Sequence, residues 1–121
     1  MYPKVAAQGG LPEQFSKFQP LVDSGWAEPE RRDRTEKRLT SDFAEIKDFY
    51  DTVVPRLHEL LSYLDQFPLK QLSDEQARLL QVAFMVAEVR NAVESFGQPD
   101  VVDGWDTRRF FIDEPLEEAS A

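Results

Sequence analysis

The stretch that decides the fold runs from Leu39 to Phe67 and reads LTSDFAEIKDFYDTVVPRLHELLSYLDQF. Large apolar residues recur in it at alternating spacings of four and three: Leu39, Phe43, Ile46, Tyr50, Val53, Leu57, Leu60, Leu64 and Phe67. Residues at this spacing lie on one face of a helix. The stretch therefore predicts a long amphipathic helix with a wide buried face, and an all-α fold class.

The residues just before Leu39 are highly charged and also fit a helix. We therefore expect the helix to cover residues 30–67. Pro55 lies inside it, and an interior proline removes a backbone hydrogen bond and pushes against the preceding turn. The apolar register continues through Pro55 unchanged. We therefore expect a kink near residue 55, with a second helix that begins at Pro55 as the alternative.

A second helix is predicted for residues 74–96. Ser73 and Gln76 have the spacing of a capping box, while Gly97 and Pro99 are typical of a helix end. The sequence LLQVAFMVAEV within it is apolar almost all round. Its polar residues form a narrow stripe: Asp74, Arg78, Gln81, Glu88 and Ser95. Such a helix must be buried on most sides.

The remaining segments flank these two helices, and we expect the whole chain, 1–121, to be one domain. Residues 1–11, with Pro3 and the pair Gly9-Gly10, are interpreted as a flexible lead. A short helix is predicted for 12–24, closed by Gly25, and residues 98–121 form a C-terminal arm.

The predicted architecture is a long antiparallel helical hairpin with a short N-terminal helix and an extended C-terminal arm. A hairpin alone cannot cover the apolar faces of residues 79–93. The chain offers its N-terminal helix and its arm as covers for one side. We expect a second copy to cover the other side, which makes a homodimer that is a helical bundle.

Composition excludes several classes of function. The net charge of −9 opposes binding to the phosphates of nucleic acid or to anionic membrane surfaces. The chain has no cysteine, no stretch of the length that spans a bilayer and no apolar signal sequence, so we expect a cytoplasmic protein.

Catalytic motifs are not visible, and we expect no enzyme, no cofactor and no metal site. His58 is the only histidine, and there is no Gly-rich phosphate loop and no G-x-S-x-G. If a ligand pocket exists, Glu88 and Arg78 are the first residues to test, with Tyr50, Phe84 and Met85 as its apolar lining. The alternative is plain core packing, with Glu88 in solvent or paired with a basic residue.

The arm combines apolar and charged side chains. Its candidate interaction residues are Trp105, Arg108, Arg109, Phe110, Phe111 and Ile112. Acidic residues follow at Asp113, Glu114, Glu117 and Glu118, whereas the run from Arg31 to Arg38 is basic. We therefore hypothesise that arm and basic run lie close together, within one chain or across a dimer. The alternative is two separate charged clusters in solvent.

The function that these features favour is a non-enzymatic, homodimeric protein-interaction or regulatory module. A small-molecule sensing bundle and an accessory subunit of a multi-component enzyme are the alternatives.

Overall fold

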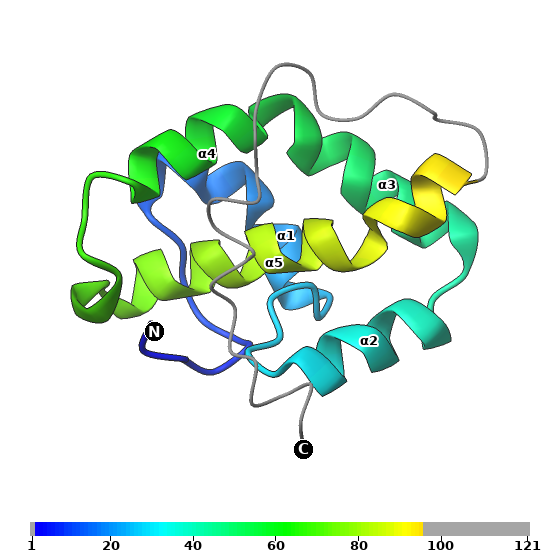
Figure 1. Ribbon diagram of the computed structural model, residues 1–121, viewed down its shortest axis with the longest axis horizontal. Coiled ribbons are helices and arrows are strands. Elements are labelled where there is room, and N and C mark those ends of the chain that lie inside the picture. Colours follow the sequence, from blue (N-terminus) through cyan, green and yellow to red (C-terminus); the bar gives the residue numbers. More distant parts are fainter. Residues whose placement is uncertain (1, 96–121) are drawn as a thin grey trace.

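The computed structural model describes residues 2–95, and the regular secondary structure in this range is helical, with no strand (Figure 1). The all-α fold class is therefore confirmed for this part of the chain. The helices are α1 (Gln19–Asp23), α2 (Arg31–Thr40), α3 (Phe43–Val53), α4 (Leu57–Leu64) and α5 (Asp74–Ser95). Three short 3-10 turns accompany them, at Glu13–Phe18, Val54–Arg56 and Leu69–Gln71. The C-terminal arm, 98–121, lies outside the described residues.

The single helix predicted for 30–67 is wrong at Ser41, where the backbone is extended and α2 ends. Asp42 then starts α3 with a capping box. Its carboxylate accepts from the backbone N–H of Glu45 at 2.9 Å, and the Glu45 carboxylate accepts from the N–H of Asp42 at 3.0 Å. This local start signal overrides the apolar spacing that runs through it.

Pro55 disturbs the helix less than the break at Ser41 does, because the backbone around it stays helical. It lies in the 3-10 turn Val54–Arg56, which joins α3 to α4. Both helices carry the apolar face that the spacing predicts, because Ile46, Val53, Leu57 and Leu60 are all buried.

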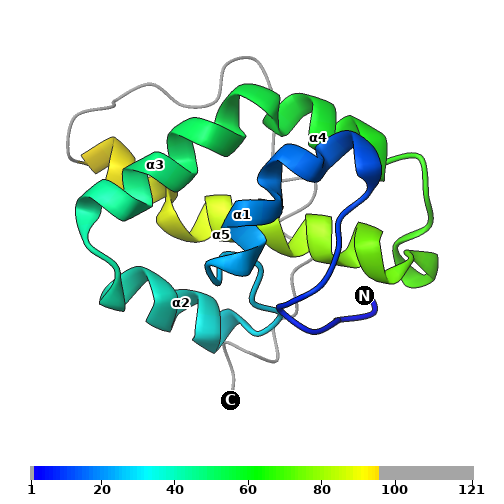
Figure 2. The same ribbon diagram turned by 180° about the vertical axis from the view of Figure 1, so that it is seen from behind.

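Helix α5 is the centre of the molecule. The chain reverses after α4, and α5 runs back along α4 and α3 (Figure 1). Ser73 and Gln76 form the predicted capping box at its start. Seen from behind, α1 and the N-terminal segment cross its other side, with α2 beside them (Figure 2). Every residue from Ala77 to Val86 is buried within this single chain.

The flexible lead predicted for residues 1–11 is wrong for residues 2–11. Tyr2 and Leu11 are buried in the core, and Val5 packs against it. The segment is held because its backbone groups find hydrogen-bond partners on α5, which the sequence pattern of the lead itself does not reveal. We call residues 2–11 the N-terminal strap.

Candidate functional site

Two residues of the polar stripe of α5, Arg78 and Gln81, lie under the N-terminal strap and are buried. The amide of Gln81, fully buried, accepts from the N–H of Val5 at 3.0 Å. The same amide donates to the carbonyl of Val5 at 3.2 Å and to that of Ala27 at 2.7 Å. Arg78 donates to the carbonyls of Ala6 and Gly10 at 2.9 and 2.8 Å. These polar side chains therefore take the place of a pairing strand for the strap.

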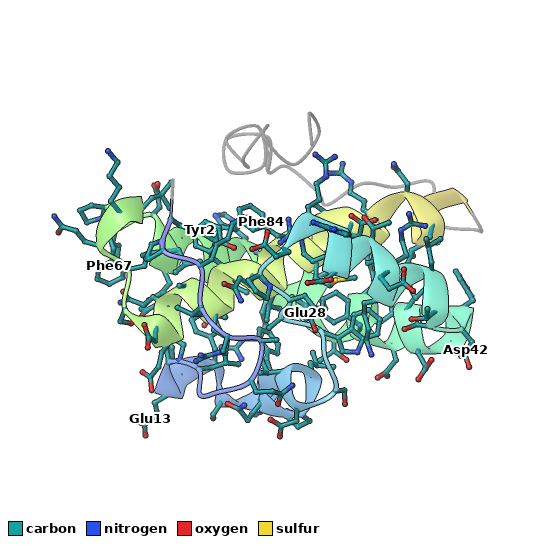
Figure 3. The ribbon with its side chains drawn as sticks, turned by 90° about the horizontal axis from the view of Figure 1, so that it is seen from below. Tyr2, Glu13, Glu28, Asp42, Phe67 and Phe84 are labelled. Atoms are coloured by element: carbon teal, nitrogen blue, oxygen red, sulfur yellow. The ribbon has the colours of Figure 1, made fainter. Side chains whose placement is uncertain are left out.

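Helix α2 contacts the body of the molecule through cationic side chains. Arg34 is only 1% exposed, and its guanidinium donates to the carbonyls of Glu28 and Pro29 at 3.2 and 3.0 Å. The same guanidinium lies 5.2 Å from the centre of the Phe84 ring, which in turn packs on Tyr2. Figure 3 shows Tyr2 and Phe84 next to each other. The contact between the Arg34 guanidinium and the Phe84 ring is a cation–π interaction within the protein.

The next turn of α2 repeats this kind of contact. Lys37 donates to the carbonyl of Ser24 at 2.7 Å, and its ammonium lies 4.8 Å from the centre of the Trp26 ring. Arg38 forms an ion pair with Glu88 of α5 at 2.8 Å, in a partly buried position. Helix α2 is thus attached by salt bridge, cation–π and carbonyl contacts, with no large apolar side chain on its inner face.

The one large apolar residue of α2, Leu39, points outward and is 65% exposed. Phe43, at the start of α3, is 41% exposed. Arg32 lies two turns before Leu39 on the same face of the helix, and Arg31 is next to it; both are exposed. We call the exposed side chains of Arg31, Arg32, Leu39 and Phe43 the α2 surface.

Electrostatics distinguish α2 from the other helices. It carries five basic and two acidic residues, and among α1 to α5 it alone is net positive. Just before it, burial raises the pKa of the Glu28 carboxyl, the charge of Asp33 raises it further, and Lys37 partly offsets both. The α2 surface is therefore a locally basic, partly apolar region on an acidic protein.

The residues predicted to form a ligand pocket separate into three groups. Tyr50 and Met85 belong to the hydrophobic core. Phe84 and Glu88 face α2, where Arg34 and Arg38 contact them, so the pairing predicted as one alternative for Glu88 is present. Arg78 holds the strap. The arm residues from Trp105 to Ile112 lie outside the described residues.

The sequence pattern predicts no binding or packing role for three residues that hold the structure together: Arg34, Lys37 and Gln81. Their signal was available, since Arg34, Lys37, Arg38 and Ser41 recur at helical spacing. That spacing indicates one packed face on α2, but the residues on it are charged and therefore look like a solvated face.

Two properties of residues 2–95 bear on the class of site. No helix in this part of the chain has the length and apolarity that crossing a membrane requires. Nor does it contain a group of three or more His, Cys, Asp or Glu side chains placed to hold a metal ion. Comparison of the chain with family models, curated proteins and solved structures found no match. Function is therefore argued from the geometry.

Proposed function

We propose that this protein is a non-enzymatic protein-interaction module and that the α2 surface is its binding surface. The observation that supports this most directly is the 65% exposure of Leu39 on the one positively charged helix among α1 to α5. A large apolar side chain two helical turns from an exposed arginine on the same face matches a partner segment that combines carboxylates with a bulky apolar residue. The occupant we propose is such an acidic, apolar peptide segment.

The energetics of this surface favour reversible binding. Fully burying an exposed leucine or phenylalanine contributes about 1.5–3 kcal/mol, and covering the parts of Leu39 and Phe43 that are still exposed contributes less than this. Exposed ion pairs with Arg31 or Arg32 add at most about 1 kcal/mol each. Association also loses translational and rotational freedom. These terms together suit a regulatory contact that forms and dissociates.

We propose that the module is a monomer, which replaces the homodimer expected from sequence. That expectation depended on α5 needing a second copy as a cover. The strap, α2, α3 and α4 provide the cover within one chain, since Ala77 to Val86 are buried without a partner.

The small-molecule alternative has less support. Phe84 and Glu88, two of the residues predicted to line a pocket, contact the protein's own Arg34 and Arg38. An accessory subunit remains compatible with the proposal, because a partner enzyme would use the same kind of surface.

Selection of displayed peptides against the immobilised full chain tests the proposal. We expect enriched peptides to combine acidic residues with a large apolar residue. Their binding should weaken when Leu39→Ser or Phe43→Ser is introduced, and it should fall with added salt. Lys70→Ser, at the opposite end of the molecule, is the matched control. Peptides of random composition, or peptides that bind the Leu39→Ser protein equally well, would overturn the proposal.

A further inference from the structure

We propose that the chain's own C-terminal segment, 98–121, occupies the α2 surface in cis and covers it until an acidic partner segment takes its place. This inference rests on the proposed function, since it assigns the first occupant of the same surface. Three observations carry it: the composition of the segment, the charge of α2, and the place where α5 ends.

The composition of the segment matches what the α2 surface would bind. It holds seven acidic and two basic residues, a net charge of −5. Its large apolar residues are Trp105, Phe110, Phe111, Ile112 and Leu116. In this chain, therefore, one segment joins the bulky apolar residues to the carboxylates that Leu39 and Arg32 together favour.

The order of residues in the segment also fits. If Phe111 and Ile112 cover Leu39 and Phe43, the acidic residues follow and point back along α2. From Ile112 to Glu117 an extended chain spans about 17 Å. Along α2, the rise from Arg32 to Leu39 is about 10 Å. Glu117 and Glu118 therefore reach Arg31 and Arg32, at the helix start, where negative charge is also favoured by the helix dipole.

The end of α5 puts the segment within reach. The last turn of α5 and the turn between α2 and α3 lie at the same end of the molecule (Figures 1 and 3). Extended chain from Ser95 to Phe110 can span up to about 50 Å. Helix α5 itself, with 22 residues, is only about 33 Å long. A single chain can therefore place its own segment on its own α2 surface without strain.

Disulfide trapping in the full chain tests this placement, because the protein contains no cysteine of its own. The test pair is Thr40→Cys with Asp113→Cys, which leaves every apolar residue of the proposed contact in place. The control pair is Glu13→Cys with Asp113→Cys. Glu13 lies far from Asp42 and the α2 surface (Figure 3).

If the segment is docked, its thiol is held close to the thiol on α2 and their effective concentration is high. The test pair should therefore oxidise at least ~10-fold faster than the control pair. The product should be a disulfide within one chain, seen by mass spectrometry and on a non-reducing gel. Adding Leu39→Ser or Arg32→Glu should slow the test pair, whereas Lys70→Glu should not. Circular dichroism of each variant checks that the helices are intact.

Other outcomes overturn the inference. Equal oxidation rates for the two pairs would show that the segment does not dock on the α2 surface. Disulfides between chains would show that the segment of a second copy docks there. Disulfide trapping tests only where the segment 98–121 docks, and peptide selection tests only whether the α2 surface binds a partner peptide. Each proposal can therefore fail without the other.

Discussion

At the scale of single residues, Gln81 explains how an extended segment can be fixed to a helix. Its amide pairs with both backbone groups of Val5 as a neighbouring peptide unit would. The sequence shows Gln81 as one polar residue in an apolar helix, a pattern that ordinarily indicates a solvent-facing stripe. Only the structure shows that Gln81 faces the backbone of Val5, because residues 5 and 81 are far apart in sequence.

Gly9 is the position where the strap depends most on residue type. Its φ of +144° is a conformation that side-chain-bearing residues rarely adopt, and a Cβ there would collide with the guanidinium of Arg78. We expect Gly9→Ala to lower the free energy of unfolding by about 1–3 kcal/mol, as measured by urea denaturation. Gly10→Ala is the control, since its Cβ would meet only Glu75 at 3.5 Å. Equal stability of the two variants would contradict this account.

Glu28 links stability to pH. Its raised pKa means that the folded state holds the proton more tightly than the unfolded state does. Its contribution to stability is therefore complete below the ordinary pKa of 4.5 and is lost as the pH rises through the raised value.

We accordingly expect Glu28→Gln to be more stable than wild type at pH 7, by less than about 1 kcal/mol because water screens this partly buried group. At pH 4 the advantage should disappear, since wild-type Glu28 is then largely protonated. Urea unfolding at both pH values measures the difference, with the exposed Glu13→Gln as control. A variant less stable than wild type at pH 7 would count against the burial of Glu28 as the cause.

At the scale of helices, α2 is attached differently from the rest. Helices α3, α4 and α5 share a continuous apolar core, whereas α2 is held by Arg34, Lys37 and Arg38. Arg34 is buried, but the contacts of Lys37 and Arg38 are partly exposed, and such polar contacts stabilise less than buried apolar area does. Helix α2 is therefore the element that should open most easily.

Hydrogen exchange measures that opening. We expect the amides of α2 to exchange faster than those of α5, and Glu88→Gln, which weakens the ion pair with Arg38, to accelerate α2 by about threefold. Glu59→Gln weakens the ion pair between Glu59 of α4 and Arg56 of the preceding 3-10 turn and provides the control. If Glu88→Gln left α2 exchange unchanged, the ion pair would not hold the helix.

The sequence predicts helices better than it predicts their ends. The apolar spacing from Ile46 to Leu64 and the capping box at Ser73 both correspond to what the structure contains. The break at Ser41 was missed because Leu39 happens to continue the apolar spacing on the far side of it. The capping box at Asp42 is a local signal, and here it determines where the helix starts in spite of the longer apolar spacing.

At the scale of the whole molecule, the sequence correctly predicts that α5 has more apolar surface than one neighbouring helix pair can bury. The solution could not be predicted, because only Tyr2, Val5 and Leu11 of the strap are large and apolar, and its attachment also depends on backbone groups that are the same in every sequence. The strap is fixed at one place because the side chains of Arg78 and Gln81 form hydrogen bonds with its backbone carbonyls.

Because one chain supplies that cover, we expect light scattering to give the mass of a monomer, 14.0 kDa, at all accessible concentrations. The full chain should be used, so that the segment 98–121 is present. A mass that doubles as concentration rises would restore the homodimer and would favour exchange of that segment between copies.

The pairing of Val5 with Gln81 also has a consequence for biosynthesis. The two residues are separated by 76 positions, so a ribosome adding about 5–20 residues per second needs roughly 4–15 s between them. During that interval the nascent strap has none of its final partners on α5. The domain therefore reaches its native state only after α5 has left the exit tunnel, and the earliest part of it to be translated is among the last to fold.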